Sequence, residues 1–388
     1  MPNSLHRVAI AGVGFSETGR RLPYSDDEMV RQAVTAAMDD AGMNPADIDG
    51  VGTMGGNAMA IGHLLGITPI NYFFTSSMMA PAFVEPAIMS ISAVASGLSH
   101  TCVAVRLIRQ MPGASDRAAA APKSGPPPIP EPMRAVGDAS FSAPFGIGAA
   151  AAGIGGFQMQ RYLSEFGATE EDFARNAVNA RWHASMNEDA LFRDELTVDD
   201  YLASRYISKP LRLLDCDYPC DSASAVIFTT EERAPDFRQK PVMVESYALS
   251  AIRDFDMSLL EDFVRNAPVH CAEALWSRTD LKPTDVDCAQ LYDGFSVITF
   301  EWLEALGFCG FGEAGGFIAD GNTRLGGSLP LNTDGGACNV GRRHGANFCI
   351  EATRQIRGQS GERQVDGAEV AVWSNAVGPF AGAVLLTA

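Results

Sequence analysis

Apolar and polar positions follow two different periods along the first forty residues. Residues 7–14 (RVAIAGVG) form an apolar run of strand length, whereas residues 29–41 carry apolar side chains at the three- and four-residue spacing of an amphipathic helix. Ser25 and Glu28 supply a capping box before this helix, and Gly42 follows its last apolar position. The pattern therefore predicts a buried strand followed by a helix with defined ends.

This order of elements occurs a second time in the chain. Residues 33–51 and 271–289 both contain an apolar helical stripe that ends in Pro-x-Asp-(Ile/Val)-Asp, at Pro45 to Asp49 and Pro283 to Asp287. A strand-like run precedes each copy, and a further helix and strand follow it. Because four elements recur in the same order, we predict an α/β chain made of two repeated βαβαβ halves.

A segment of different character separates the two halves. Residues 122–132 (PKSGPPPIPEP) are too rich in proline for regular structure, and helical patterns follow them before an apolar run returns. We expect residues 113–222 to form an inserted loop domain that is able to cover a cleft. The N-terminal half then comprises residues 1–112 and 223–240, and the C-terminal half comprises residues 241–388.

Composition and charge narrow the classes of function. With 46% hydrophobic and 20% charged residues over 388 positions, the chain has the composition of a globular protein. A formal charge of −18 argues against a nucleic-acid partner, because phosphate backbones require a basic face, although a local arginine cluster can still bind a small anion. The sequence shows no signal-peptide pattern and no apolar run of membrane-spanning length, so we expect a cytoplasmic protein that does not bind a membrane.

The eight cysteines are scattered and mostly lie in apolar runs, which is typical of buried free thiols. Cys216 and Cys220 form the only close pair, and two ligands fall short of the four that a structural zinc site normally uses. We therefore expect no bound metal. The glycine-rich residues 145–157 do not follow a strand into a βαβ unit, which argues against a bound dinucleotide, and we expect no separate cofactor.

The segment GGACNVGRRHGANF, residues 335–348, has the form of a loop that delivers a reactive side chain. A glycine pair and Gly341 precede Arg342, Arg343 and His344. Together with PLRLLDC, DSASAVIFT, YDGF and EATRQIRG, this segment resembles the thiolase superfamily, and within it the bacterial thiolase-like branch related to sterol-carrier-protein-type thiolases. The resemblance covers essentially the whole chain. It implies a thiolase-like five-layered αβαβα fold, a homodimer, and an acyl thioester of coenzyme A as substrate.

A thiolase uses four reactive positions, and all four are changed in this chain. The resemblance places the nucleophilic cysteine near Ala80, but no cysteine precedes Cys102. The NEAF-like motif becomes YDGF from Tyr292 onward, the histidine of GHP becomes Arg342, and the second cysteine falls near Ser374. No acyl-enzyme can form through cysteine, which excludes thiolysis of the Claisen type.

The same scaffold can stabilise the enolate of a coenzyme A thioester without a nucleophile. That enolate is a product of retro-aldol cleavage of a β-hydroxyacyl thioester, which also needs a base for the hydroxyl proton. The aldolases of bacterial steroid side-chain degradation look similar, lack the cysteine, and carry tyrosine at both the NEAF and the GHP places. Tyr292 matches the first tyrosine, and Arg342 departs from the second. We predict such a lyase, with a steroid side-chain thioester among its candidate substrates. A thiolase-related acyltransferase or condensing subunit and a non-catalytic thioester-binding subunit are the alternatives.

The candidate catalytic residues are Tyr292, Asp293, Arg342 and His344. Tyr292 is the candidate base, and since its ordinary pKa is about 10, it needs a nearby cation such as Arg342 to favour the phenolate. His344, whose ordinary pKa lies close to neutrality, is the alternative base or proton shuttle. Each also has a structural interpretation as a buried strand end, a surface charge or a helix cap, and Asp293 can serve by bonding the backbone alone.

Three further residues are candidates for contact with the thioester ligand. They are Arg343 at its phosphates, His183 in a tunnel of the inserted domain, and Gly336 in the glycine pair. A structural role is the alternative for His183 and Arg343. Proteins of this branch commonly work with a small OB-fold partner that carries a zinc ribbon. The resemblance therefore implies a homodimer that binds two such partners in a heterotetramer.

Overall fold

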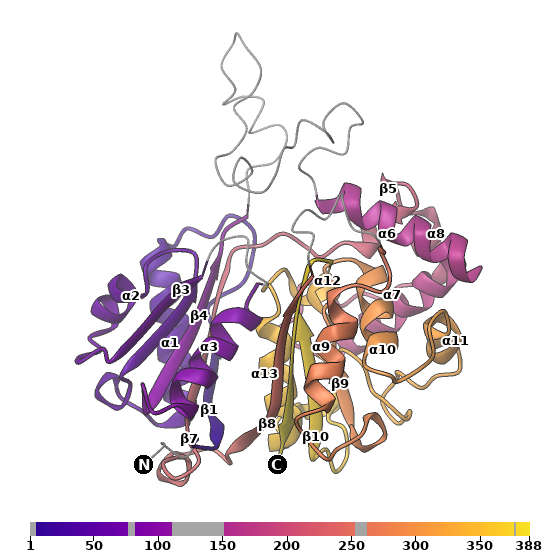
Figure 1. The fold of residues 1–388 in the computed structure, drawn as a ribbon. Helices are drawn as coiled ribbons and strands as arrows, with labels where there is room; N and C mark the ends of the chain where they lie inside the picture. The colour runs from indigo at the N-terminus through magenta and orange to yellow at the C-terminus, as the bar shows by residue number, and fades with distance from the viewer. Residues whose placement is uncertain (1–4, 77–81, 111–150, 253–261, 376–377) are drawn as a thin grey trace.

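The computed structural model describes residues 5–76, 82–110, 151–252, 262–375 and 378–388, and its centre is a mixed β-sheet (Figure 1). The strands follow the order β3-β2-β4-β7-β1-β8-β11-β10-β9. The N-terminal strands are β1 (Val8–Phe15), β2 (Gly50–Met54), β3 (Tyr72–Ser76), β4 (Thr101–Ile108) and β7 (Ser222–Thr230). The C-terminal strands are β8 (Val242–Ala251), β9 (Cys288–Gln290), β10 (Val370–Asn375) and β11 (Phe380–Thr387).

The two parts of the sheet have the same topology, which confirms the predicted repeat. The order β2-β4-β7-β1 corresponds to β9-β10-β11-β8, with one parallel contact followed by two antiparallel contacts in each. β3 is an additional strand at the outer edge of the first part. β1 and β8 join the parts through two residue pairs, Ala9 with Met243 and Ile10 with Val242. Because this join is short, the halves depend on the packing of helices between them.

Helices lie on both outer faces of the sheet and between its halves. α1 (Asp26–Ala41) and α2 (Ala58–Leu65) pack on the first half, and α9 (Ala267–Trp276) and α10 (Ser296–Ala305) pack on the second. α3 (Val84–Ala95) and α13 (Ala346–Arg357) lie between the halves, where their buried side chains contact strands of both (Figure 1). The layers therefore follow the predicted αβαβα order.

The boundaries of α1 are those that its sequence predicts. The Ser25 side chain accepts a hydrogen bond from the backbone N–H of Glu28, and Gly42 ends the helix in the left-handed region at φ 70°. A non-glycine residue adopts that conformation at a steric cost. The predicted apolar face, from Met29 to Ala41, is buried against the sheet.

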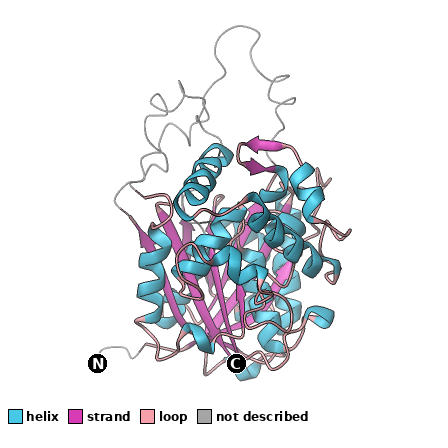
Figure 2. Cartoon of the chain, turned by 90° about the vertical axis from the view of Figure 1, so that its right-hand side faces the viewer, coloured by secondary structure: helices cyan, strands magenta, loops and turns pink. Residues whose placement is uncertain are grey.

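A smaller group of elements precedes β7 and packs on the second half. It contains α6 (Ala151–Phe166), α7 (Glu170–Ser185), α8 (Val198–Ala203) and the hairpin of β5 (Tyr206–Ser208) and β6 (Leu211–Arg212). α6 and α7 contact α10, and α7 also contacts α11 (Ala314–Ala319), beside which they lie in Figure 1. Figure 2 turns this side of the molecule toward the viewer and shows helices in front of the strands. Residues 122–132 and Ala80 lie outside the described residues. Among the helices that the structure describes, none is long and apolar enough to cross a membrane.

Candidate active site

Side chains from both halves meet where α12 (Ala337–Val340) leads into α13. They come from β4, from the loop before β7, from the loop after β9, and from α12 with the residues that follow it. Electrostatic interactions connect them with one another. We call this group the central cluster: Arg106, Asp217, Tyr292, Cys338, Arg342 and His344. The first two are buried and the other four are partly exposed.

Tyr292 is held at the end of the short strand β9. Its backbone N–H donates to Ser374 Oγ at 3.3 Å, and its ring meets Phe348 edge-on at a centroid distance of 6.2 Å. The ring also lies over Gly294, where a Cβ atom would come within 2.6 Å of the phenol oxygen. Burial and the carboxylate of Asp217 raise the pKa of Tyr292, and Arg342 lowers it by a smaller amount.

This pKa corrects one prediction made from the sequence. Arg342 favours the phenolate of Tyr292 as expected, but the combined effect of burial and Asp217 is larger, so the pKa of Tyr292 rises above its ordinary value. The free protein therefore holds Tyr292 as a neutral phenol at neutral pH.

Arg342 forms a bidentate ion pair with a residue that sequence analysis did not identify. Its Nε and Nη2 donate to the two oxygens of Asp217 at 2.8 and 2.6 Å. The backbone N–H of Arg342 donates to the carbonyl of Tyr218 at 2.7 Å. Burial opposes the charge, but Asp217 outweighs it and raises the pKa of Arg342. The available sequence signal was the pair of acids in LLDCDYPCD, Asp215 and Asp217, within an otherwise apolar segment.

His344 has an unusual backbone conformation, and its neighbours hold it in place. Its φ is 48°, in the left-handed region that non-glycine residues adopt at a cost. The carbonyl of His344 accepts hydrogen bonds from Phe83 N at 3.1 Å and from Asn375 Nδ2 at 2.5 Å. Gly345 must lack a side chain, because a Cβ atom there would lie 1.5 Å from Asn375 Nδ2.

Arg106 lies behind the ring of His344, and sequence analysis also missed it. Its Nη2 is 3.1 Å from His344 Nδ1, and its Nη1 donates to the carbonyls of Met54 and Leu107 at 2.8 and 2.9 Å. Burial lowers the pKa of Arg106 to about 10, so the guanidinium is still charged at neutral pH. A charged residue inside the apolar run HTCVAVRLI was the signal that could have found it.

The charge state of His344 differs from the prediction that it titrates near neutral pH. Burial lowers its pKa well below the ordinary value, and the cations Arg106 and Arg342 lower it further. The imidazole is therefore neutral in the free protein, and a base role at this position is weak.

Asp293 and Gly336 form a structural contact beside the cluster. The carboxylate of Asp293 accepts hydrogen bonds from the backbone N–H groups of Ala337 at 2.8 Å and Cys338 at 3.4 Å, at the start of α12. A Cβ atom on Gly336 would lie 2.1 Å from Asp293 Oδ2, so the second glycine of the pair is required there. Burial raises the pKa of Asp293 to about 8, but with 3% of its surface exposed this carboxyl presents almost no face to a ligand.

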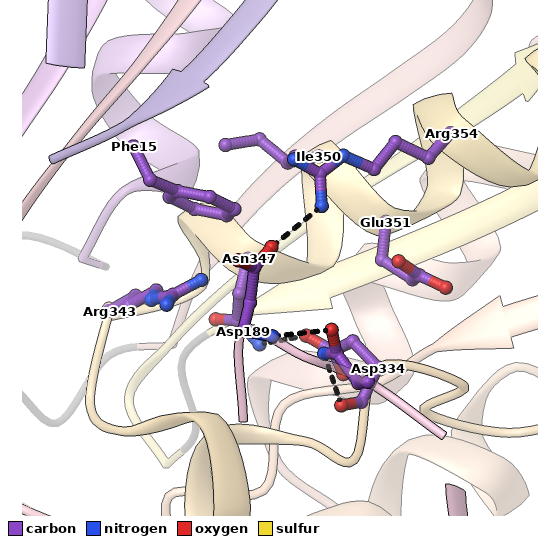
Figure 3. Close-up of a pocket in the computed structure, with 9 residues that line it drawn as sticks. Phe15, Asp189, Asp334, Arg343, Asn347, Ile350, Glu351 and Arg354 are labelled. Carbon is purple, nitrogen blue, oxygen red and sulfur yellow. Dashed lines mark hydrogen bonds and ion pairs between the residues drawn. The ribbon is translucent and has the colours of Figure 1, made fainter. Parts of the chain in front are cut away.

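Arg343 points into a different, small pocket (Figure 3). Its guanidinium stacks 3.9 Å from the ring centroid of Phe15, and its Nη2 donates to Thr18 Oγ1 at 3.1 Å. Asp189, which pairs with Arg354 at 3.1 Å, also lines this pocket. The pocket shares no residue with the central cluster. The adjacent side chains of Arg342 and Arg343 therefore lie in different surroundings.

His183 is fully buried on α7 rather than exposed along a tunnel. Burial lowers its pKa to about 4, so the ring is neutral. The backbone of Leu331 and of Asn332 acts on this pKa in the opposite direction, but less strongly than burial. The structure thus gives His183 no surface toward a ligand and favours the structural interpretation.

The sulfur atoms near the cluster are neutral thiols. Cys338 donates to the carbonyl of Asp293 at 3.3 Å, and burial raises the pKa of Cys338 well above its ordinary value. Burial also raises the pKa of Cys216 to about 12 and that of Cys220 to about 11. A thiolate nucleophile is therefore disfavoured at each of these positions.

Known proteins resemble this chain over almost its full length. Residues 250–386 match the family model for the thiolase C-terminal domain-like family. The chain is 33% identical to the steroid side-chain-cleaving aldolase of Thermomonospora curvata over 97% of each chain. It is 35% identical to the 17-hydroxy-3-oxo-4-pregnene-20-carboxyl-CoA lyase of Mycobacterium tuberculosis, over 91% of this chain and 92% of that one. The solved structure of the Ltp2-ChsH2(DUF35) aldolase matches with a TM-score of 0.87 and 30% identity, covering 99% of this chain and 98% of that chain.

Proposed function

The chain belongs to the thiolase-like family of acyl-CoA aldolases, and on this premise we propose that it cleaves the Cα–Cβ bond of a β-hydroxyacyl-coenzyme A thioester. In this retro-aldol reaction the β-hydroxyl group loses its proton to a base and becomes a carbonyl group. The electrons of the broken bond form the enolate of the shortened thioester, which then takes a proton at Cα. No acyl group passes to the protein, so no nucleophile is needed.

The observation that carries this proposal is the chemical nature of the four partly exposed side chains in the central cluster. The partly exposed side chains of the central cluster are a neutral phenol, a neutral imidazole, a guanidinium and a protonated thiol. Donors and a cation of this kind stabilise negative charge on a thioester oxygen, whereas an acyl-transfer route through cysteine needs a thiolate.

We propose that Tyr292 accepts the β-hydroxyl proton, because it is the partly exposed residue of the cluster that carries an ionisable hydroxyl group. The active species is then its phenolate, which is scarce at neutral pH because the pKa of Tyr292 is raised. His344 supplies an N–H group for the thioester oxygen. Arg342 sets the charge next to Tyr292 and is itself held in place by Asp217. Asp293 positions α12 through its backbone contacts.

For the acyl group we propose a bulky, steroid-type substrate. The fragment that bears the β-hydroxyl group is released as a ketone. The names of two relatives, a steroid side-chain-cleaving aldolase and a pregnene-carboxyl-CoA lyase, support this choice. Coenzyme A enters as part of the substrate, and the proposal requires no further cofactor.

For its assembly we propose a homodimer that binds a partner subunit of the DUF35 type, a small OB-fold protein with a zinc ribbon. The name of the Ltp2-ChsH2(DUF35) aldolase supports a partner of this kind. Exposed apolar side chains on α6 and the β5–β6 region, Phe157, Ile207 and Leu213, offer a surface for it. The edge strand β3, in which Phe73 is 56% exposed, offers one for a second copy of the chain.

The test is a panel of β-hydroxyacyl and β-ketoacyl thioesters, with and without the partner subunit, analysed by mass spectrometry. We expect β-hydroxyacyl thioesters to yield a ketone or aldehyde and a shorter thioester without added coenzyme A. Cleavage of β-ketoacyl thioesters that depends on free coenzyme A would instead support the acyltransferase alternative and contradict this proposal.

A further inference from the structure

Arg106 is a buried cation that pairs with no carboxylate in the described ranges of the chain. It is 4% exposed, and its guanidinium contacts two backbone carbonyls and an imidazole nitrogen. By contrast, the buried Arg363 pairs with Glu351 at 3.1 Å, and Arg212 pairs with Glu170 at 2.6 Å. An uncompensated buried charge is costly, so its retention calls for a physical reason.

The contact with His344 has a definite chemical consequence. A guanidinium has only donors, so Nδ1 of His344 must be the acceptor in the 3.1 Å contact. The neutral ring then carries its hydrogen on Nε2. The left-handed backbone of His344 is held through its carbonyl by Phe83 and Asn375, and the Nδ1 contact with Arg106 orients the ring itself.

We infer that Arg106 is a positioning residue of an oxyanion site in which the Nε2–H group of His344 is the donor. Arg106 fixes the tautomer of the ring and adds positive charge behind it. The inference rests on the proposed function, because the enolate of the cleavage reaction supplies the negative charge that the resting site lacks. The site is thus complementary to the transition state rather than to the neutral thioester.

Two other charged or titratable groups face this pair and enter the test. Arg342 acts on the charge of His344, and Tyr292 interacts with Arg106. If the role of Arg106 were instead to balance the phenolate of Tyr292, its effect on the preference for an enolate-like anion would disappear in Tyr292→Phe. Under the inference, Tyr292→Phe leaves the preference of the site for an enolate-like anion in place.

The tautomer can be read from the wild-type protein without any turnover. The chain has six histidines, so ¹⁵N-histidine labelling gives a small set of signals, and His344→Gln identifies the one of interest. We expect a pyridine-type Nδ1 and a protonated Nε2 for His344 in the free protein. A protonated Nδ1 with a pyridine-type Nε2, or a ring that is doubly protonated at neutral pH, overturns the inference.

Ligand binding gives the second readout. The two probes are acetyl-coenzyme A and carboxymethyldethia-coenzyme A, in which a carboxylate mimics the enolate. We expect Arg106→Met to reduce the preference for the carboxylate probe by about 10- to 100-fold. Losses of this size occur when a metal-binding histidine loses the residue that orients its ring. Arg106→Lys should retain part of the preference. Arg109→Met is the matched control: Arg109 lies just beyond the same strand, pairs with Asp26 at 2.7 Å, and should leave the preference unchanged.

The two readouts separate this inference from the proposed function. An equal loss for both probes in Arg106→Met and Arg106→Lys indicates a purely structural role and overturns the inference, as does an unchanged preference in Arg106→Met. If the predicted tautomer and preference are found but no β-hydroxyacyl thioester is cleaved, the oxyanion site stands and the proposed reaction fails.

Discussion

Replacing Arg342 with methionine should destabilise the protein mainly through the carboxylate that it leaves behind. Asp217 is 5% exposed, and both of its oxygens accept hydrogen bonds from Arg342, at 2.8 and 2.6 Å. Removing one partner of a buried ion pair costs about 3–5 kcal/mol, because the other charge stays buried. The Arg342 side chain is itself 32% exposed, so we expect the lower end of this range, about 3 kcal/mol.

The loss of stability in this variant should grow with pH. Burial raises the pKa of Asp217 and Arg342 lowers it, so removing the arginine raises that pKa further. A carboxyl group whose pKa is higher in the folded than in the unfolded chain destabilises the fold increasingly as pH rises above its ordinary pKa of about 4. The variant should therefore be closest to the wild type near about pH 4–5 and furthest from it above neutrality.

Urea unfolding at acidic and at neutral to alkaline pH measures both effects. Adding Asp217→Asn to Arg342→Met should recover most of the lost stability, because it removes the uncompensated charge. Arg7→Met is the control: Arg7 pairs with Glu231 at 2.9 Å, but the two side chains are 58% and 44% exposed, so we expect less than about 1 kcal/mol. A loss in Arg342→Met no larger than in this control, or a double variant no more stable than the single one, would refute the reasoning.

Four further predictions concern activity. Tyr292→Phe should lower turnover by about 10²-fold or more while binding of the thioester changes far less, as steady-state rates and calorimetry can show; near-native turnover would make Tyr292 structural. Because the reaction uses the phenolate and the pKa of Tyr292 is raised, kcat should rise with pH through neutrality without levelling off below the ordinary range of tyrosine; a plateau set by a group with a pKa of about 8 would instead point to Asp293. Cys338→Ala should leave most activity because the proposed reaction uses no thiolate, whereas a loss of turnover with thioester binding retained would revive a cysteine mechanism. Arg342→Lys should keep more activity than Arg342→Met because lysine keeps the positive charge, but less than the wild type because it lacks the planar fork.

The fold could be predicted from the sequence because its signals are local and occur twice. The capping box at Ser25, the apolar face of α1 and the repeated turns at Pro45 and Pro283 each act over a few residues. Their recurrence in the same order indicated the two halves, and the structure has the corresponding strand orders in each. The order of the five layers, by contrast, was implied by the resemblance to the thiolase superfamily rather than by these local signals.

The central cluster could be predicted only in part, because its chemistry depends on such distant contacts. Tyr292, Arg342 and His344 were found from the YDGF and GG motifs, and the structure brings them together. Arg106 lies 238 positions from His344, and Asp217 lies 125 positions from Arg342, so neither pairing can be read from spacing. The ionisation states follow from these pairs and from burial, which explains why the pKa of Tyr292 is raised rather than lowered and why His344 does not titrate near neutral pH.

Cleavage of a β-hydroxyacyl-coenzyme A labelled with ¹³C at Cβ, run in D₂O without free coenzyme A, tests the central claim most directly. The retro-aldol mechanism predicts that the label appears only in the ketone or aldehyde. It also predicts that the shortened thioester forms in equal amount with one deuterium at Cα, where the enolate is protonated. Cleavage that requires free coenzyme A, or a shortened thioester without solvent deuterium at Cα, would contradict the claim.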